Sequence, residues 1–358
     1  MPAGFGPIPG LKIGHAQDVA ALTGCTVFVV GEAATNGITA ACEVRGGAVG
    51  ERELAVLDPG HIAERIHGLV FAGGSAFGLD AASGVMRWLE ERGIGFDTGV
   101  AREGATQTIR VPIVPAAILF DLGIVAKTRG SARRPDAAMG YAAAQAAVES
   151  PVAEGNVGAG TGASVGKLFG IERAMKAGIG CWTEMVRVAS ESGETVRVAA
   201  LAVVNAFGDV RDLETGRLLA GARIENAPDS AVEVDSFAYE LLDTARAMRQ
   251  GNVRGKFAGS NPAASRGTNT VLAAVATDAA LTRMEAKRVA VMAAAGMART
   301  LSPAHTTFDG DIVFVLSVGS APADVNAVGA AAADAVARAI VRGVTQARSA
   351  AGLPGLAG

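Results

Sequence analysis

The chain has 358 residues, half of them hydrophobic, and a formal net charge of −3 that is spread without long runs of either sign. A nucleic-acid-binding domain normally carries a basic face, so this composition argues against a nucleic-acid partner. Apolar stretches of roughly 18 residues without charges or glycine breaks do not occur, and no membrane span is expected. The amino terminus lacks a basic start followed by an apolar core, so no secretory signal is predicted and a cytoplasmic location is expected.

The first half of the sequence alternates short apolar runs with one clear helical pattern. Strands are predicted at residues 26–30, 38–43 and 69–71, and a helix at 79–92 that ends at Gly93. The apolar segment 111–120 contains two prolines, so we expect it to be extended or bent.

The second half continues the alternation. Helices are predicted at 133–148 and 226–250, strands at 196–205, 270–277 and 312–318, a glycine loop at 155–167 and an exposed loop at 251–269. Thr282 and Glu285 have the capping-box spacing ahead of a helix that runs to about residue 301. Asp324 can cap a final helix to about residue 348. This order predicts a mixed α/β fold.

Three cysteines, Cys25, Cys42 and Cys181, are widely spaced and none lies in a CxxC pair. An odd number at such spacings argues against a disulfide framework and against a zinc site. We expect buried or incidental thiols.

The glycine loop at 155–167 invites a nucleotide interpretation. A P-loop ending at Lys167 would need Gly at 161 and Ser or Thr at 168, where the chain has Thr161 and Leu168. A relaxed dinucleotide fingerprint is met, but the residues before it are not a buried strand. A nucleotide-binding enzyme is therefore kept as a weak alternative, and no cofactor is expected.

Two other segments resemble chemical motifs only in part. Ser75 follows a predicted strand and glycine turn, but Phe77 stands where a nucleophile elbow needs glycine, so Ser75 is interpreted as a turn or cap residue. His305, Asp309 and Asp311 could suggest metal ligands, but the chain has four histidines and no HxxxH spacing. No metal site is expected.

Ordered blocks along nearly the whole chain carry a family resemblance. They read GCTVFVV, VRGGAVG, FAGGSAFGLDAASGVMRWLEERGIGF, VPIVPAAILFDLG, GNVGAGTGASVGK, VVNAFGD, GTNT with VLAAVATDA, and HTTFDGDIVF. The chain resembles the L-aminopeptidase/D-amidase-esterases, a family that includes β-peptidyl aminopeptidases and nylon-oligomer endo-hydrolases. The resemblance implies an αββα sandwich of the N-terminal-nucleophile type with its own topology.

Members of that family cleave themselves in front of a Ser or Thr, which becomes the nucleophile. Carried onto this chain, the resemblance places the cut between Asn269 and Thr270, with Thr268 as the rival hydroxyl. A single catalytic domain would then consist of residues 1–269 and 270–358. The resemblance also implies a small peptide or amide substrate and a homo-oligomer, tetrameric or larger.

The residues around Thr270 fit this chemistry independently. An exposed loop gives the rearrangement room, and the following strand then fixes the nucleophile. A threonine hydroxyl needs a base, and an α-amino group with an unperturbed pKa near 8 supplies one only after cleavage.

The resemblance assigns further roles by position. Asn205 matches the asparagine whose amide stabilises the oxyanion, and Lys167 matches the lysine that closes the glycine loop in the nylon-oligomer branch. Asp309 and Asp311 match the pair that hydrogen-bonds the nucleophile and its amine. Carboxylates beside an α-ammonium would raise its pKa, so we expect them to orient it rather than activate it.

One position departs from the family. Some branches carry an oxyanion tyrosine in the segment matching 114–122, where this chain has Phe120 and no nearby tyrosine. Either Asn205 acts with backbone N–H groups or the correspondence in that segment is shifted. The aspartate pair favours an endo-type oligoamide hydrolase as the alternative activity. An uncleaved binding protein on the same scaffold is the alternative that is not an enzyme.

Overall fold

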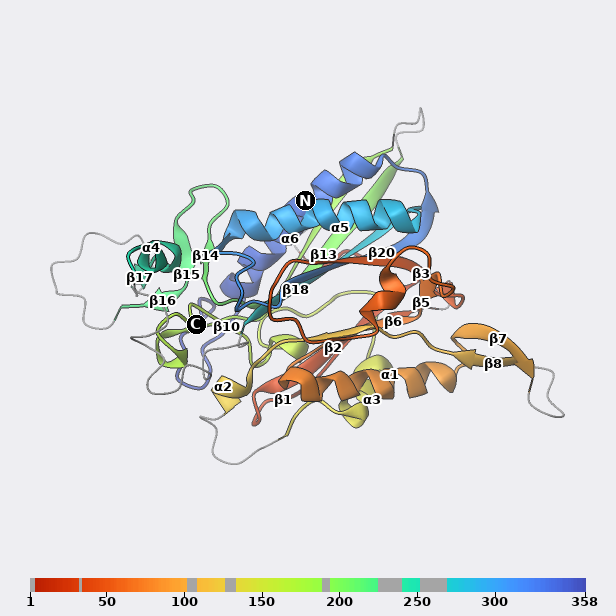
Figure 1. Cartoon of the computed structure of the whole chain (residues 1–358), viewed down its shortest axis with the longest axis horizontal. Helices are drawn as coiled ribbons and strands as arrows, with labels where there is room; N and C mark the ends of the chain where they lie inside the picture. Colours follow the sequence, from red (N-terminus) through yellow and green to blue (C-terminus); the bar gives the residue numbers. More distant parts are fainter. Residues whose placement is uncertain are drawn as a thin grey trace.

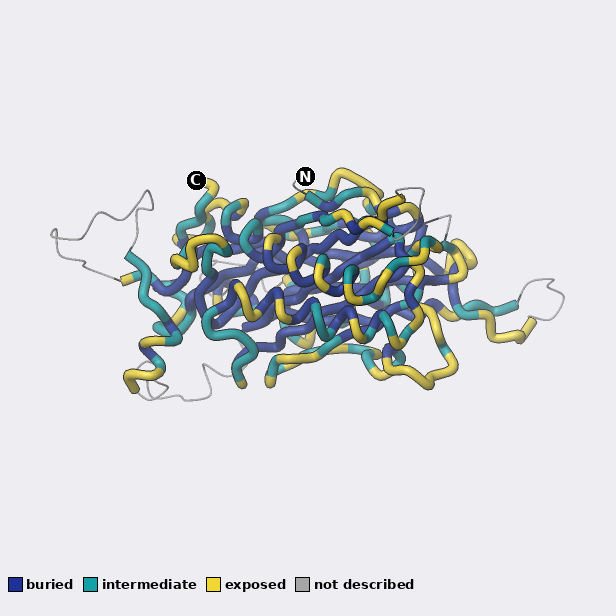
Figure 2. Tube along the Cα trace, turned by 90° about the horizontal axis from the view of Figure 1, so that it is seen from above, coloured by how far each residue is buried: buried dark blue, intermediate teal, exposed yellow. Residues whose placement is uncertain are grey.

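The computed structural model describes residues 4–31, 34–101, 108–125, 133–188, 194–224, 240–251 and 269–358. Two β-sheets lie face to face in the middle of these ranges, and helices cover the outer face of each (Figure 1). Viewed from above, buried residues run through the centre of the molecule and exposed residues form its rim (Figure 2). The predicted αββα sandwich is therefore seen as four layers.

The larger sheet has six strands and contains the candidate nucleophile. Its order is β12 (Ile179–Arg187), β13 (Thr195–Asn205), β18 (Thr270–Ala279), β20 (Ile312–Ala321), β3 (Ile38–Val44) and β5 (Arg65–Ile66). Only the β18–β20 pair is parallel, and the other neighbours are antiparallel. Helices α5 (Arg283–Thr300) and α6 (Val325–Thr345) pack on its outer face.

The second sheet has five strands. Its order is β1 (Leu11–Asp18), β2 (Thr23–Val30), β6 (Gly68–Ala72), β9 (Ala116–Ile118) and β4 (Glu51–Arg52). Helices α1 (Ala81–Glu90) and α3 (Ala137–Gln145) cover it from outside. The remaining elements are short: β7 (Phe96–Ala101), β8 (Thr108–Val111), α2 (Leu122–Val125), β10 (Ser164–Val165), β11 (Met175–Lys176), β14 (Asp209–Arg211), β15 (Leu218–Ala220), β16 (Ala222–Arg223), β17 (Leu241–Leu242), α4 (Thr244–Arg249) and β19 (Leu301–Ser302).

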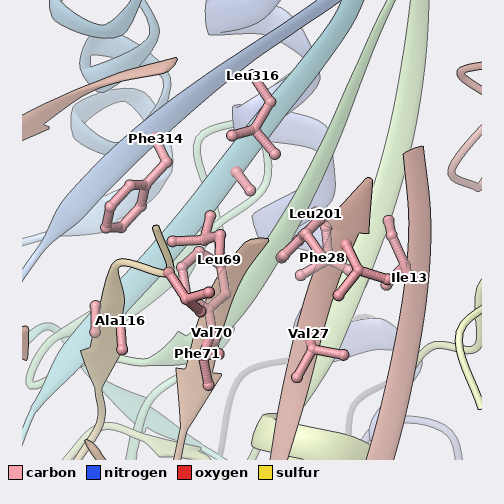
Figure 3. Packing of buried hydrophobic residues seen from close by; sticks show 14 of the residues in the cluster. Ile13, Val27, Phe28, Leu69, Val70, Phe71, Ala116, Leu201, Phe314 and Leu316 are labelled. Carbon is pink, nitrogen blue, oxygen red and sulfur yellow. The ribbon is translucent and has the colours of Figure 1, made fainter. Parts of the chain in front are cut away.

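Large side chains from both sheets meet in the central core (Figure 3). Phe71 of β6 packs against Phe28 of β2 and against Phe314 of β20, with ring centroids 5.5 and 5.6 Å apart. A second core lies between the six-stranded sheet and helices α5 and α6. Side chains of β18 enter both cores in alternation, which explains why this strand is apolar at nearly every position.

Most predicted elements are present close to their expected bounds. The capping box of Thr282 and Glu285 forms at the start of α5, and the side chain of Asp324 accepts two backbone N–H groups at the start of α6. The helix expected from residue 133 begins at Ala137, because Asp136 caps it. No helix of the described ranges is long and apolar enough to cross a membrane.

Some elements differ from the predictions, and one predicted loop falls outside the described residues. The helix predicted at 226–250 is replaced, in its described part, by the short strand β17 and the six-residue helix α4, which Asp243 caps. Strands β1 and β12 were not predicted. The exposed loop predicted at 251–269 lies almost wholly outside the described residues, as do Gly267 and Thr268 of the GTNT block.

Candidate active site

Strand β18 lies between β13 and β20 in the larger sheet (Figure 1). Thr270 is its first residue. It pairs across the sheet with Asn205, the last residue of β13. On the other side, its neighbour Asn269 forms a parallel bridge with Asp309. The sheet thus brings four of the sequence-predicted residues to the same end of two central strands.

The hydroxyl of Thr270 donates a hydrogen bond to the carbonyl oxygen of Asn269, the residue before it. That carbonyl oxygen also accepts the backbone N–H of Gly310 at 2.9 Å. Thr270 is only 3% exposed and Asn269 is fully buried. The hydroxyl therefore lies beside the peptide bond that the family resemblance marks for cleavage.

Asn205 is fully buried, and its side-chain amide is held at both ends. The Oδ1 atom accepts Lys167 Nζ at 2.6 Å and the backbone N–H of Ser164 at 3.2 Å. The Nδ2 atom donates to the carbonyl oxygen of Phe120 at 3.1 Å. The N–H of Ser164 can only donate and the carbonyl of Phe120 can only accept, so these two partners fix which end of the amide is the donor.

Lys167 closes the glycine loop and reaches Asn205 twice, since its Nζ also donates to the Asn205 backbone carbonyl at 3.2 Å. Burial lowers the pKa of Lys167 to about 7, against the opposing effect of Asp309 and Asp121, which raise it. A lysine with such a pKa is partly uncharged at neutral pH, whereas a solvated lysine is almost fully charged.

The two aspartates anchor backbone on both sides of the site. Asp311 accepts the N–H of Val271 at 2.8 Å through Oδ1, and the N–H and ring Nδ1 of His305 through Oδ2. Asp309 accepts the N–H of Phe207 at 3.1 Å and also binds Thr306. Burial, and then the nearby Asp311, raise the pKa of Asp309 to about 6.

Three groups at the site were not singled out as functional in the sequence. Lys176 is fully buried, and its Nζ donates to the carbonyl oxygens of Gly160, Ala163 and Ala177, so it ties the glycine loop in place. The other two are the backbone carbonyl of Phe120 and the backbone N–H of Gly310.

The block VRGGAVG also has a role that its letters do not reveal. A Cβ atom at Gly46 would lie 2.2 Å from the Asp309 carbonyl oxygen and 2.3 Å from the Asp311 nitrogen. Only glycine fits this close approach to the aspartate turn.

Ser75 begins a 3-10 turn over Ser75–Asp80, in agreement with its interpretation as a turn residue. Its N–H donates to the carbonyl of Leu119. Within the described ranges, no group of three His, Cys, Asp or Glu side chains is arranged to hold a metal ion. Cys25, Cys42 and Cys181 are free and buried.

Comparison with known proteins decides the family. Residues 7–357 match Peptidase family S58. The chain belongs to this family. An uncharacterized aminopeptidase of Mycobacterium tuberculosis is 39% identical over 97% of this chain and 95% of its own length. A 6-aminohexanoate-oligomer endohydrolase of Kocuria sp. is 29% identical over 86% of this chain and 73% of its own length.

Two solved structures share the fold. A Burkholderia sp. β-aminopeptidase superposes with a TM-score of 0.63 at 21% identity, covering 99% of this chain and 92% of its own. The L-aminopeptidase D-Ala-esterase/amidase of Ochrobactrum anthropi, described as a variant of the Ntn hydrolase fold, gives 0.64 at 17% identity, covering 97% and 88%. The predicted N-terminal-nucleophile type of sandwich is confirmed. Membership of a peptidase family makes amide-bond hydrolysis the chemistry for which the site must account.

Proposed function

We propose that the chain is a precursor that cleaves its own Asn269–Thr270 bond and then hydrolyses amides with Thr270 as its N-terminal nucleophile. The observation that carries the proposal is the hydroxyl of Thr270 lying against the Asn269 carbonyl at the start of a buried central strand. A nucleophile must be held within reach of the carbonyl that it attacks, and here the strand and its neighbours hold it.

Self-cleavage needs no outside nucleophile other than water. The Thr270 oxygen bonds to the Asn269 carbonyl carbon, the C–N bond breaks, and the hydroxyl proton ends on the departing nitrogen. The resulting ester is opened by water, which leaves a carboxylate on Asn269 and a free α-amine on Thr270. That amine is the base that the hydroxyl lacks in the precursor.

In the processed enzyme the α-amine accepts the Thr270 hydroxyl proton as the oxygen attacks the substrate amide. We assign the substrate oxyanion to the amide of Asn205, one of whose N–H groups is held by Phe120. Lys167 keeps the oxygen of that amide turned away, so that its nitrogen serves as the donor. Asp309 and Asp311 orient the backbone around both residues.

The family indicates the chemical class of the substrate, a molecule with an amide bond. We propose a small peptide or amide, with a linear oligoamide as the second candidate because relatives at 29% identity are named as hydrolases of 6-aminohexanoate oligomers. A homo-oligomeric assembly, tetrameric or larger, belongs to the same proposal.

Electrophoresis of the purified chain under denaturing conditions tests the proposal. Two fragments of roughly 27 and 9 kDa are expected from the residue counts on either side of the cut. Turnover of amino-acid p-nitroanilides, compared with turnover of linear and cyclic oligoamides, then separates the two substrate classes. A single intact band without amidase activity would favour the uncleaved binding protein.

A further inference from the structure

The carbonyl group of Asn269 has a second contact that the proposed function does not use. The backbone N–H of Gly310 donates to its oxygen at 2.9 Å, beside the parallel bridge between Asn269 and Asp309. During self-cleavage this oxygen is the atom that gains negative charge, because the Thr270 hydroxyl adds to the carbon that bears it. A donor already aimed at it needs no rearrangement when the charge forms.

The N–H of Gly310 is held in place by its neighbours. The carbonyl oxygen of Asp309 accepts the N–H of Ala48 at 2.8 Å, and that of Asp311 accepts the N–H groups of Arg45 and Gly46 at 2.9 and 3.1 Å. The carboxylates of both aspartates are buried and hydrogen-bonded as well. The peptide group that contains the Gly310 N–H is thus fixed through the Asp309 carbonyl, and the chain just beyond it is fixed through the Asp311 carbonyl.

The absence of a side chain at residue 310 is part of this arrangement. A Cβ atom built on Gly310 would lie 2.8 Å from the Thr270 hydroxyl oxygen and 2.6 Å from the Ala48 carbonyl oxygen. Glycine therefore lets the backbone approach the nucleophile and the carbonyl that it attacks at the same time.

We infer that the backbone N–H of Gly310 is the oxyanion donor of the self-cleavage step, separate from the Asn205 amide assigned to substrate hydrolysis. This inference rests on the proposed self-cleavage at Asn269–Thr270. As the Thr270 oxygen bonds to the carbon and the π electron pair moves onto the Asn269 oxygen, the Gly310 N–H stabilises that oxygen. When the C–N bond breaks, the pair returns to the carbonyl and the proton is on the departing nitrogen. The two donors reach Thr270 from opposite neighbours, Gly310 from the β20 side and Asn205 from β13.

The test replaces this one N–H with oxygen and changes little else. Glycolic acid incorporated at position 310 of the full-length precursor turns the amide between Asp309 and Gly310 into an ester. The matched control is lactic acid at Ala276, which removes a backbone N–H in the middle of β18, between β13 and β20. Appearance of the small fragment is followed by mass spectrometry, and thermal unfolding checks that each precursor is folded.

The ester at 310 is expected to slow self-cleavage by roughly 10²–10³, while the ester at 276 cleaves within a few-fold of the unmodified chain. Equal rates for all three precursors, or equal slowing in both esters, would overturn the inference. Failure of the unmodified chain to cleave would instead contradict the proposed function. A crystal structure of the Thr270→Ala precursor gives a check that does not depend on the ester. A Gly310 N to Asn269 O distance below about 3.2 Å is expected, and one above about 3.5 Å would overturn the inference.

Discussion

The backbone N–H of Val271 donates to the carboxylate of Asp311 at 2.8 Å. Val271 follows the candidate nucleophile directly, so this bond fixes the Cα atom from which the Thr270 hydroxyl extends. Because Val271 and Asp311 are both buried, water cannot replace the bond if the carboxylate is lost.

Asp311→Ala is therefore expected to destabilise the chain and to slow its cleavage. A buried N–H left without a partner costs about 1–3 kcal/mol of folding free energy. Denaturant unfolding in the Thr270→Ala background, where the chain should stay intact, measures this loss. Asp311→Asn is the control, since its Oδ1 can still accept from Val271, and it should lose less stability. Equal stability of Asp311→Ala and the parent would show that the bond does not hold the strand.

Asn205→Ala is expected to leave a folded chain whose turnover of a p-nitroanilide substrate falls by roughly 10²–10³, the usual size for losing one oxyanion donor. Steady-state kinetics on processed enzyme gives kcat and KM separately, and the loss should fall on kcat. Asn326→Ala, in the first turn of α6, serves as a matched asparagine control and should keep normal kinetics. Near wild-type turnover in Asn205→Ala would move the oxyanion role to backbone N–H groups.

Lys176 should make stability depend on pH. Burial lowers its pKa from 10.5 to about 7, so between these values the unfolded chain binds the proton and the folded chain does not. Stability should therefore rise as pH increases from about 7 toward 10, and the cost of burying the charge is fully present below pH 7. Lys167 has the same direction of shift, so it contributes a similar slope.

Lys176→Met removes this titrating group. The free energy of unfolding should then rise less steeply with pH in this range, by about 1.4 kcal/mol per pH unit. Urea unfolding of the Thr270→Ala precursor at several pH values measures it, and a variant of an exposed basic residue such as Arg92→Met should leave the slope unchanged. An unaltered slope in Lys176→Met would mean that Lys176 stays charged in the fold.

Local signals explain which elements could be predicted from sequence. The helix α5 has a capping box and β18 is apolar on both faces, so each is visible within its own residues. Strand β12 lies at the edge of its sheet and mixes buried positions with Trp182, Glu184 and the exposed Met185, which blurs the pattern of alternation. The six-residue helix α4 begins at an Asp243 cap, which lies inside the longer helix predicted at 226–250.

The sequence likewise revealed some groups of the candidate site and not others. Thr270, Asn205 and Lys167 were found because side chains can be matched to a family pattern, and the structure does bring them together. The carbonyl of Phe120 and the N–H of Gly310 are backbone groups, which every residue has, so no letter in the sequence marks them. The burial of Lys176 comes from the packing of the glycine loop and could not be seen among 32 basic residues.

Thr270→Ala should give a folded, full-length and inactive chain, whereas Thr270→Ser should still cleave itself. Alanine has no oxygen to attack the Asn269 carbonyl, while serine keeps one and lacks the branching at Cβ. Electrophoresis and an amidase assay on both variants measure the difference. Cleavage of Thr270→Ala at the same bond would end the hypothesis that Thr270 acts on its own peptide bond.

The most direct test is the amino-terminal sequence of the small fragment released by the purified wild-type chain. Edman degradation or intact-mass measurement reports which bond was cut, independently of any substrate. The expected fragment begins Thr270-Val271-Leu272 and extends to residue 358. A fragment beginning at Thr268, Asn269 or Val271, or a chain that stays intact while hydrolysing amides, would show that Thr270 is not the N-terminal nucleophile.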